Sequence, residues 1–402
     1  MAQQQPLPDE TDVLVVGAGI IGTSTAFRLA SETDRDVTLV DRDNVAAGAT
    51  GDSSAILRQQ YYGNELYAEM ARRGRELYET FEEETGEPLA TADSPLVGFL
   101  KNGTESAARF ERGADVIREM GLSASTYDRA ELEARYPMFE FPEEVDYAVS
   151  DDEAAYSDGT DAASGFARAA QDAGATLVTG VAVESIATED GVVVGAETDA
   201  GRIDCDDVVL AAGRWSGQIA ETVGVDLPIL PSREQILLLQ PPEDVTQEEL
   251  ETIPTTGSGG FDWDVHWYFR PDFGGKIYMG THQRSEFVDP DDYDRDPDEE
   301  MVLNAVEFLS EVVPRLADAK IIGQFCGVYA NTPDNEFIID QVGPDGCYAL
   351  VGAGHAFKHG PVIGQLAKDL VVDGESDLFD LDEFRLDRFD GKPTDEIYAE
   401  SL

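Results

Sequence analysis

The sequence predicts an α/β fold in which two domains are interleaved along the chain. Short, uniformly apolar runs, typical of parallel strands buried on both faces, occur at 13–16, 207–213 and 348–354, and each ends in or is followed by glycine. The segments between them alternate helical patterns with longer strands rich in branched residues. We therefore expect a Rossmann-like domain, interrupted by an α+β domain built on a mostly antiparallel sheet.

The first apolar run leads into a glycine motif. Gly17, Gly19 and Gly22 follow the predicted strand at 13–16 and open a helix that continues through 25–30. Gly17 permits a tight turn, Gly19 lets the backbone approach a pyrophosphate, and Gly22 lets the helix lie close against the strand. In this arrangement the free N–H groups at the start of the helix point at the phosphates.

A second predicted strand, at 36–41, ends in Asp41. This carboxylate follows Gly22 at about the spacing of the acidic residue that bonds a ribose hydroxyl. Because strand, glycines, helix, strand and carboxylate come in the required order, the sequence predicts a dinucleotide site. A segment of small and polar residues follows at 46–58 and is typical of a loop that presents backbone amides and hydroxyls to a polar ligand.

The composition is strongly acidic. Among 402 residues, Asp and Glu number 82 and Lys and Arg number 28, which gives a formal net charge of -54. This balance excludes a generic nucleic-acid binder, because phosphate contacts need clustered basic side chains. The hydrophobic share of 42% argues against disorder. We expect a folded protein with the acidic surface of a halophilic organism, so the charge reports on habitat more than on function.

Cysteine use and hydropathy predict a cytoplasmic protein. Cys205, Cys326 and Cys347 are odd in number and lack the spacing of a metal site, so no metal is expected. They indicate a reducing interior without a disulfide framework. The first residues have neither the basic region nor the apolar core of a signal peptide, and no apolar run reaches the ~20 residues of a membrane span.

Hydrophobic periodicity assigns the remaining elements in order. The strands between 175 and 197 are expected to form a meander, and 266–279 a hairpin. The acidic segment at 288–300 is expected to be a solvated loop. We expect helices around 66–77, 104–120, 130–136, 158–173, 215–223, 301–316 and 361–370, and strands at 96–100, 143–150, 175–178, 181–186, 192–197, 229–239, 266–270 and 276–279.

Several motifs together resemble the D-amino-acid-oxidase-like superfamily of FAD enzymes, and most closely its sarcosine oxidase and N-methyl amino acid oxidase group. The resemblance covers nearly the whole chain. Its motifs are 17–22 with Asp41-Arg42, then 50–58, 210–215, 329–340 and 352–358. The motifs at 329–340 and 352–358, together with Arg58, are the most specific to amine-oxidising members.

The resemblance implies an FAD-binding domain that a substrate-binding domain interrupts twice. FAD is favoured over the NAD that a simple dinucleotide motif also allows, because a helix starting near 352–361, beside the isoalloxazine, would stabilise the negative charge that develops on reduction. The implied FAD-binding segments are 1–92, 151–226 and 325–402, and the substrate-binding segments are 93–150 and 227–324. The implied FAD-binding residues are Gly17, Gly19, Ile20, Ile21, Gly22, Asp41, Arg42, Thr50, Gly51, Ser53, Ser54, Val183, Ala212, Gly213, Trp215, Gly354, His355, Ala356, Phe357 and Lys358.

Arg58 and Lys358 match the pair of residues that holds the substrate carboxylate in the sarcosine oxidase group. A planar guanidinium and a point charge can share one carboxylate in a desolvated pocket. Taken singly, Arg58 also fits a surface ion pair, and Lys358 a solvated position at a helix start. Tyr329 would lie over the substrate, with His282 and Tyr268 lining the same cavity. For these three, a structural role in the core is the alternative.

The sequence departs from the group at positions near the flavin. Gly327 occupies the place of the cysteine in members with covalently bound flavin, and Cys326 is one position off, so noncovalent FAD is expected. Gly51 and Ala55 replace a histidine and an arginine of those members. Tyr278 falls where a lysine assists oxygen activation, so the electron acceptor can be O2 or another compound.

The resemblance implies oxidation of a small N-alkyl amino acid, such as sarcosine, dimethylglycine or a proline-like compound, by hydride transfer to flavin N5. The pocket would supply orientation and desolvation rather than acid–base groups. Two alternatives stay open: flavin-dependent oxidation of a 2-hydroxy acid or primary amino acid, and an FAD-binding subunit of a larger amine-oxidising complex. The implied partners are a small carboxylate-bearing amine and O2 or another electron acceptor, with the oligomeric state unspecified.

Overall fold

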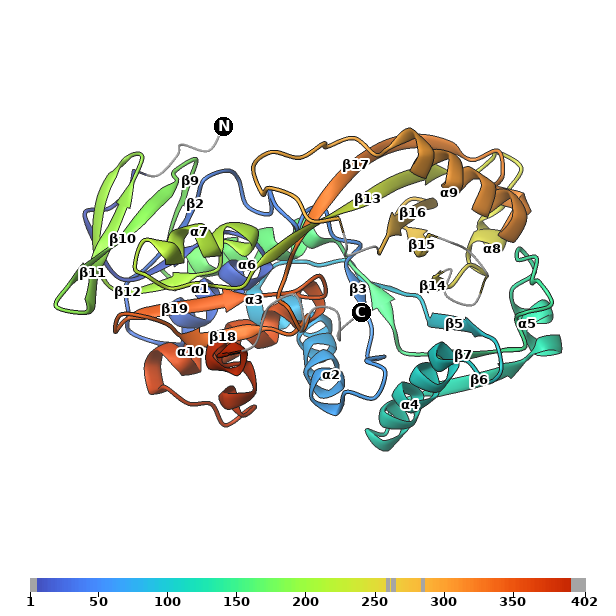
Figure 1. Cartoon of the computed structure of the whole chain (residues 1–402), viewed down its shortest axis with the longest axis horizontal. Helices are drawn as coiled ribbons and strands as arrows, with labels where there is room; N and C mark the ends of the chain where they lie inside the picture. The colour runs from blue at the N-terminus through green and yellow to red at the C-terminus, as the bar shows by residue number, and fades with distance from the viewer. Residues whose placement is uncertain (1–5, 258–260, 262–264, 283–285, 392–402) are drawn as a thin grey trace.

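Two large sheets organise the molecule. The computed structural model describes residues 6–257, 261, 265–282 and 286–391. Within these residues, two eight-stranded sheets lie side by side along the long axis of the molecule (Figure 1). This arrangement of mixed sheets and helices confirms the predicted α/β fold class.

The first sheet contains a parallel core. β1 (Glu10–Val16) lies between β12 (Gly201–Leu210) and β2 (Val37–Asp41). β9 (Thr176–Thr179) extends this core beyond β2, and β19 (Cys347–Val351) extends it beyond β12. All these neighbours are parallel, as the uniformly apolar runs predicted. β9 had been expected in a meander with the strands that follow it, and this was wrong because it pairs with β2 instead.

Antiparallel strands complete the first sheet at its ends. β10 (Val183–Glu189) and β11 (Val192–Thr198) form the meander with β12. β18 (Ile338–Gln341) pairs with β19. The chain therefore returns to this sheet in its last third, as expected.

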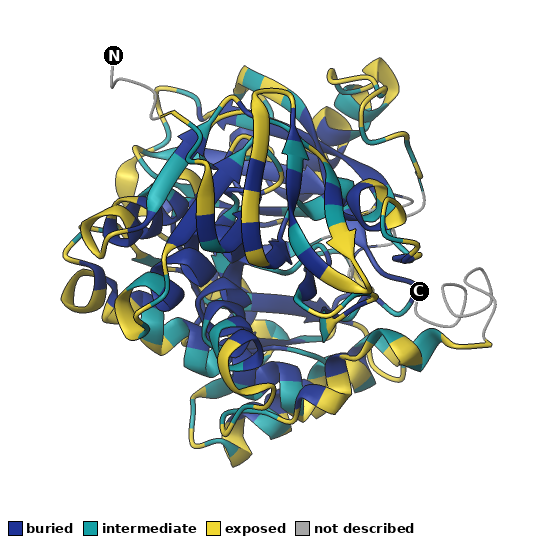
Figure 2. Ribbon diagram, turned by 90° about the vertical axis from the view of Figure 1, so that its left-hand side faces the viewer, coloured by how far each residue is buried: buried dark blue, intermediate teal, exposed yellow. Residues whose placement is uncertain are grey.

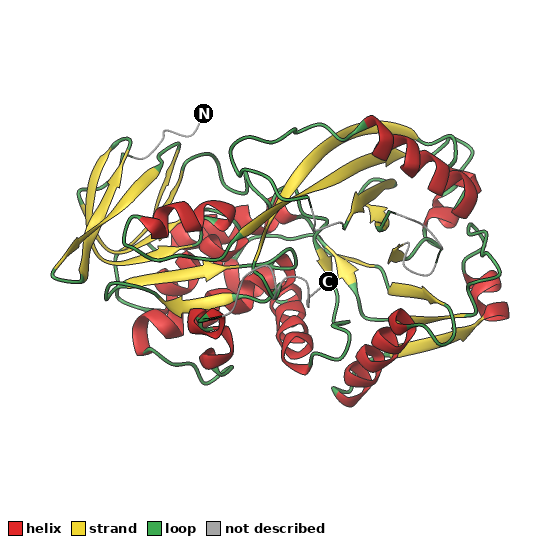
Figure 3. Ribbon diagram, in the orientation of Figure 1, coloured by secondary structure: helices red, strands yellow, loops and turns green. Residues whose placement is uncertain are grey.

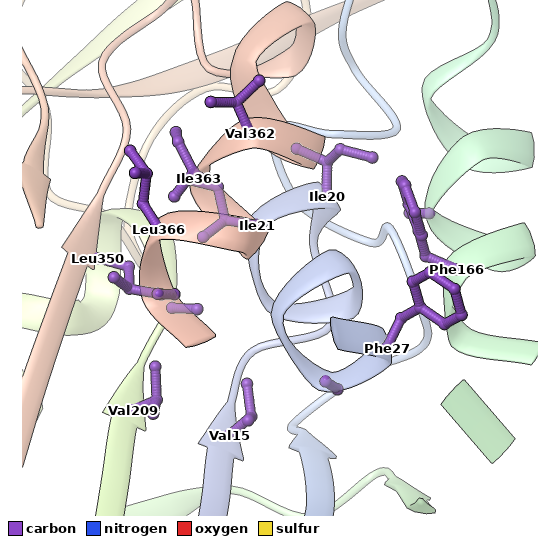
Figure 4. Packing of buried hydrophobic residues seen from close by; sticks show 14 of the residues in the cluster. Val15, Ile20, Ile21, Phe27, Phe166, Val209, Leu350, Val362, Ile363 and Leu366 are labelled. Atoms are coloured by element: carbon purple, nitrogen blue, oxygen red, sulfur yellow. The ribbon is translucent and has the colours of Figure 1, made fainter. Parts of the chain in front are cut away.

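Three helices cover one face of the first sheet. α1 (Ile20–Glu32) packs between α6 (Gly159–Asp172) and α10 (Gly360–Asp373). Figure 4 shows side chains of α1 and α10 meeting over Val15 and Leu350 of the sheet. Burying each apolar side chain of this kind stabilises the fold by about 1.5–3 kcal/mol. This packing fixes the start of α1 against the sheet.

The sequence places several helix starts through capping side chains. Asn64, Thr104, Asp128 and Asp158 each accept a hydrogen bond from a backbone N–H in the first turn of the helix that follows. These helices are α2 (Glu65–Glu79), α4 (Glu105–Glu119), α5 (Arg129–Arg135) and α6. α1 differs, because its N-cap residue is Gly19 and has no capping side chain.

The second sheet is almost entirely antiparallel. Its strand order is β17-β13-β16-β15-β14-β5-β7-β6. Among the described strands of this sheet, only β14 and β5 pair in parallel, so the prediction of a mostly antiparallel sheet is confirmed. The strands are β17 (Lys320–Asn331), β13 (Leu230–Gln240), β16 (Lys276–Thr281), β15 (Trp267–Asp272), β14 (Thr255–Gly257), β5 (Leu96–Leu100), β7 (Tyr147–Asp151) and β6 (Ala124–Asp128).

A second core lies between this sheet and α9 (Glu299–Val312). Trp267, Phe269 and Phe308 are buried in it, and Trp267 Nε1 donates a hydrogen bond of 2.7 Å to Asn304 Oδ1 of α9. Figure 2 shows buried strands inside the molecule and exposed residues on outer helix faces and loops.

The remaining elements connect the two sheets. β13 and β17 are long and lean toward the first sheet (Figure 3). β17 runs across the boundary proposed between 324 and 325, and the proposed domain segments stay predictions. No helix in the described part of the chain is long and apolar enough to cross a membrane. The other elements are α3 (Phe81–Thr85), α7 (Ser216–Glu221), α8 (Gln247–Leu250) and a small sheet of β3 (Ile56–Leu57), β8 (Ala155–Tyr156) and β4 (Ala92–Asp93).

Candidate cofactor and substrate site

A large pocket opens at the carboxyl ends of β1 and β2, the edge at which parallel sheets bind ligands. It holds about 1640 Å³ of empty space, its mouth included. Residues of β13, β15 and β17 from the second sheet close its other side. Of the residues predicted to bind FAD, its wall contains Gly17, Gly19, Ile20, Ile21, Asp41, Arg42, Thr50, Ser53, Ser54, Val183, Ala212, Gly213, Trp215, Gly354, Ala356 and Phe357.

The glycine turn has the geometry that a dinucleotide requires. Gly17 has a φ of 108°, and a Cβ there would lie 2.5 Å from the carbonyl oxygen of Ala211. A Cβ on Gly22 would lie 1.8 Å from the carbonyl oxygen of Gly17, so Gly22 packs helix on strand and does not line the pocket. Gly19 offers no side-chain cap, and Thr50 Oγ1 accepts from the N–H of Ile20, while the dipole at the start of α1 still favours an anion.

The loop after β2 completes the cradle. Thr50 Oγ1 accepts a hydrogen bond of 3.0 Å from the N–H of Ile20, which places a hydroxyl beside the helix start. Gly51 is off the wall, and its N–H donates to the carbonyl oxygen of Ala46 at 3.1 Å. A Cβ on Gly51 would lie 2.4 Å from that oxygen. Gly51 therefore shapes the turn, and Thr50, Ser53 and Ser54 face the ligand space.

Asp41 lies where a ribose-binding carboxylate is expected. Its Oδ2 accepts from the N–H of Ala18 at 2.6 Å, and its Oδ1 accepts from the N–H of Asp43 at 2.8 Å. Burial raises the pKa of Asp41, and the two backbone donors oppose this shift. Each oxygen keeps a lone pair for a further donor such as a ribose hydroxyl.

The acidic segment at 288–300 is a largely exposed loop up to Asp298, as predicted, and its Asp291 contacts Trp215 at the pocket rim. Asp291 Oδ1 accepts 2.9 Å from Trp215 Nε1 and pairs with Arg42 at 3.2 Å. The Arg42 guanidinium also stacks 4.8 Å from the centre of the Trp215 ring. The chain between β16 and α9 is thus tied across to the first sheet.

The predicted carboxylate-binding pair converges on an aromatic ring that the sequence reading had missed. The guanidinium carbon of Arg58 and the ammonium of Lys358 lie 4.6 Å and 5.9 Å from the centre of the Tyr61 ring. Neither cation lines the large pocket, but Phe357, next to Lys358, does. Arg58 Nη1 is buried and has no hydrogen-bond partner within the described part of the chain. A buried guanidinium nitrogen in this state indicates an anion site.

One carboxyl group and one imidazole lie beside the pair. Asp151 lies near Arg58, but its Oδ2 is held by the N–H groups of Gln59 and Gln60 at 2.6 and 3.1 Å. Burial raises the pKa of Asp151 to about 6. Burial and the nearby ammonium of Lys358 lower the pKa of His359 to about 3, so that imidazole stays neutral.

His355, predicted to contact FAD, contacts Tyr61 and Lys358. Its Nδ1 lies 3.4 Å from the Tyr61 hydroxyl, and its Nε2 lies 2.8 Å from the carbonyl oxygen of Asn335. It does not line the large pocket. Its carbonyl oxygen accepts a 3.2 Å hydrogen bond from Lys358 Nζ. His355 thus helps to place both Tyr61 and Lys358.

The three other predicted substrate residues come together. The ring centres of Tyr268 and His282 are 6.3 Å apart, and those of His282 and Tyr329 are 6.1 Å apart. Tyr268 and Tyr329 line the pocket, whereas His282 is exposed and lies beside them. A Cβ on Gly354 would lie 2.7 Å from the Tyr329 ring, so this glycine lets the ring approach the loop after β19.

Two carboxyl groups on the wall were also missed. Glu234 is 1% exposed and accepts a 3.0 Å hydrogen bond from Thr281 Oγ1. Asp52 lies across from Gly327, and burial raises its pKa to about 6. An acidic residue inside the branched run 229–239 was the available signal for Glu234. No feature of the sequence distinguished Asp52 from the other polar residues of its loop.

A side chain at Gly327, the position aligned with a flavin-linking cysteine, would make a tight contact. A Cβ on Gly327 would lie 3.2 Å from Asp52 Cβ. Cys326 does not line the large pocket, and burial raises the pKa of its thiol to about 11. Tyr278, at the position of the expected lysine, donates from its buried hydroxyl to the carbonyl oxygen of Asp52 at 2.7 Å.

Known proteins resemble this chain over nearly its whole length. Residues 12–370 match the DAO family model, described as FAD dependent oxidoreductase. Monomeric sarcosine oxidase of Bacillus sp. (strain B-0618) is 26% identical over 94% of this chain and 96% of its own length. Sarcosine oxidase subunit beta of Rhizobium meliloti (strain 1021) is 27% identical over 97% of this chain and 91% of its own.

A solved structure shows the same architecture. L-proline dehydrogenase from P. horikoshii superposes with a TM-score of 0.84 at 25% identity, over 95% of this chain and 98% of that one. The family match spans most of the chain, and the glycine turn and the Asp41 carboxylate lie on the wall of the large pocket. This protein therefore belongs to the DAO family of FAD-dependent oxidoreductases.

Proposed function

We propose that this enzyme oxidises a small N-alkyl amino acid, such as sarcosine, dimethylglycine or a proline-like compound. The observation that carries the proposal is the buried Arg58 Nη1, which has no hydrogen-bond partner in the described part of the chain and lies on the same ring as Lys358. Two cations around one aromatic ring form a site for a single carboxylate. Their retention in a chain of net charge -54 supports a binding role.

The residues of the site divide the work of binding. FAD, when bound in the pocket, supplies the group that takes a hydride from the carbon next to the substrate nitrogen. Arg58 and Lys358 hold the carboxylate and thereby orient that carbon. Tyr268 and Tyr329 lie over the ligand space and exclude water from it. Burial raises the pKa of Tyr268, so its hydroxyl stays protonated and can donate a hydrogen bond.

The relatives support the amine part of the proposal. Two of them are named for sarcosine and one for L-proline, which are both N-alkyl amino acids. An aromatic wall suits such a substrate, because alkyl groups on nitrogen add apolar surface and a cationic amine is attracted to ring faces. Noncovalent FAD is proposed from the crowding at Gly327.

A substrate panel tests the proposal. The purified yellow holoenzyme is mixed anaerobically with sarcosine, dimethylglycine, proline, glycine and lactate, and the flavin absorbance is followed. Bleaching by one or more N-alkyl amino acids supports the proposal. Bleaching by glycine or lactate alone would transfer the assignment to primary amino acids or 2-hydroxy acids.

A second candidate role is that of an FAD-binding subunit in a larger amine-oxidising complex. The match to a sarcosine oxidase subunit beta over 97% of this chain favours it. Size-exclusion chromatography in high salt, followed by activity assays of the isolated chain, tests this role. An isolated subunit would bleach with substrate but turn over only with its partner. We further propose a cytoplasmic location in a salt-adapted cell, supported by the net charge of -54 and three free cysteines.

A further inference from the structure

A second pocket adjoins the cofactor pocket. It holds about 1010 Å³ of empty space, its mouth included. Half of its twelve lining residues also line the cofactor pocket and form the wall between the two. These shared residues are Arg42, Asp43, Ala47, Asp52, Arg214 and Trp215. Its outer wall comes from 290–295 and from Phe325 and Cys326 of β17. A ligand here would lie one layer of side chains from the cofactor.

Two arginines dominate this second pocket. The Arg214 guanidinium lies 3.8 Å from the centre of the Trp215 ring and 5.6 Å from that of Tyr293, and it is 8% exposed. Arg295 stacks on the other aromatic ring, 5.5 Å from the centre of Tyr293. Neither arginine forms an ion pair with any residue in the described ranges, although the chain has 82 acidic residues.

The acidic residues of the pocket form no ion pair with Arg214 or Arg295 in the described ranges. Asp291 is held by Arg42 and by Trp215 Nε1. Asp43 lies 3.8 Å from Arg42. Asp52 faces Arg214 and Arg295, yet burial still raises its pKa to about 6. The two guanidinium groups therefore offer free hydrogen-bond donors for an anion, which a guanidinium binds in its plane.

The aromatic side chains define the shape of that anion. Trp215, Tyr293 and Phe325 line the pocket and give it flat apolar surfaces. Rings of this kind favour a planar ligand through stacking. The Nε of Arg214 donates 3.3 Å to the carbonyl oxygen of Pro290, which fixes its planar group beside these rings.

We propose that this second pocket is the docking site of a planar, anionic, quinone-like electron acceptor. The proposal rests on the proposed function, because an enzyme that oxidises amines must pass the electrons on. In each turnover a secondary amine loses two electrons and two protons and becomes an imine. The acceptor gains two electrons and two protons and becomes its hydroquinone-like form. Arg295 binds the negative charge of the acceptor at the mouth of the pocket.

The test uses the anionic dye 2,6-dichlorophenolindophenol with the complete holoenzyme. Arg295→Gln removes the charge without touching the cofactor pocket, and Arg118→Gln, on the exposed side of α4, is the matched control. Equilibrium dialysis measures dye binding to the oxidised holoenzyme, and steady-state turnover gives the KM for the dye. We expect Arg295→Gln to raise both Kd and KM about tenfold to hundredfold. The control should change neither.

Three further readouts separate the outcomes. The rate of anaerobic bleaching by the amino acid and the KM for menadione, an uncharged quinone, should be the same in both variants and the parent. Equal dye affinity in all three proteins would overturn the proposal. Loss of FAD from Arg295→Gln on dialysis, with dye affinity unchanged, would overturn it too, because Arg295 would then serve the cofactor. Dialysis of the dye needs no substrate, so failure of the amine panel is distinguishable from failure of this site.

Discussion

The guanidinium carbon of Arg58 lies 4.6 Å from the centre of the Tyr61 ring. Lys358 approaches the same ring, at 5.9 Å. The ring stabilises both positive charges, because each is attracted to its negative face. In the proposed function, the substrate carboxylate would then offset one unit of this charge.

The first prediction concerns Arg58. Arg58→Ala should raise the KM for the amino acid about tenfold to hundredfold, since a hydrogen bond to a charged group contributes about 1.5–3 kcal/mol. Arg58→Lys should recover only part of this, because an ammonium cannot reproduce the planar pair of donors. Steady-state kinetics and anaerobic titration measure the effect. Arg168→Ala, an exposed arginine paired with Glu87, is the control. An unchanged KM, or loss of the yellow colour, would contradict the assignment.

The second prediction concerns Tyr61. Tyr61→Phe keeps the ring face and loses only the hydroxyl, which lies 3.4 Å from His355 Nδ1. Tyr61→Leu removes the attraction to both cations, which is worth about 0.5–2 kcal/mol for each. We expect KM to change less than about threefold for the first variant and to rise about tenfold for the second. Equal effects of the two substitutions would show that the hydroxyl, not the ring face, matters.

The parts of the site that the sequence predicted are those tied to one local motif. Gly17, Gly19 and Gly22 carry a turn whose backbone geometry leaves little choice of residue, and Asp41 follows at a fixed distance along the next strand. Arg58 and Lys358 came from the resemblance to a family, and their meeting at one ring needed the structure. No spacing in the sequence relates residues 58, 61 and 358.

The parts that the sequence could not predict arise from contacts between distant segments. Asp291 lies in a run that is acidic enough to suggest a solvated loop, yet its contact with Trp215 depends on how the two sheets lie against each other. Glu234 lines the pocket because β13 crosses from the second sheet toward the first. β9 pairs with β2 rather than β10, and hydrophobic periodicity does not indicate with which strand β9 pairs.

The third prediction concerns Gly22. A Cβ there would lie 1.8 Å from the carbonyl oxygen of Gly17, so Gly22→Ala must push α1 away from the turn. We expect loss of FAD on gel filtration and a destabilisation of about 1–3 kcal/mol, the usual cost of overpacking. Gly217→Ala in helix α7 is the matched control, because its Cβ would make only ordinary contacts, at 3.6 Å to Leu227 O and 3.8 Å to Ile229 Cδ1. The control should keep FAD and be equally stable or more so. Retention of FAD by Gly22→Ala would contradict the cradle.

The fourth prediction concerns the pH dependence of stability at Asp151. Burial raises its pKa from 3.8 to about 6, so the folded protein favours the neutral carboxyl. In the unfolded state the Asp151 carboxyl loses its proton at a lower pH than in the folded protein. The free energy of unfolding should therefore fall as the pH rises from about 4 to 6. The expected decrease is about 3 kcal/mol, at 1.36 kcal/mol per pKa unit. Below about pH 4 this contribution is complete, and above about pH 6 it is lost.

Asp151→Asn isolates that contribution from the general charge of the chain. The amide oxygen can still accept the N–H groups of Gln59 and Gln60, but it does not ionise. Urea unfolding in high salt should therefore show the variant gaining stability relative to the parent between pH 4 and 7. Asp292→Asn, an exposed acidic residue, should keep the slope of the parent. Parallel curves for Asp151→Asn and the parent would mean that burial does not raise the pKa of the Asp151 carboxyl in the folded protein.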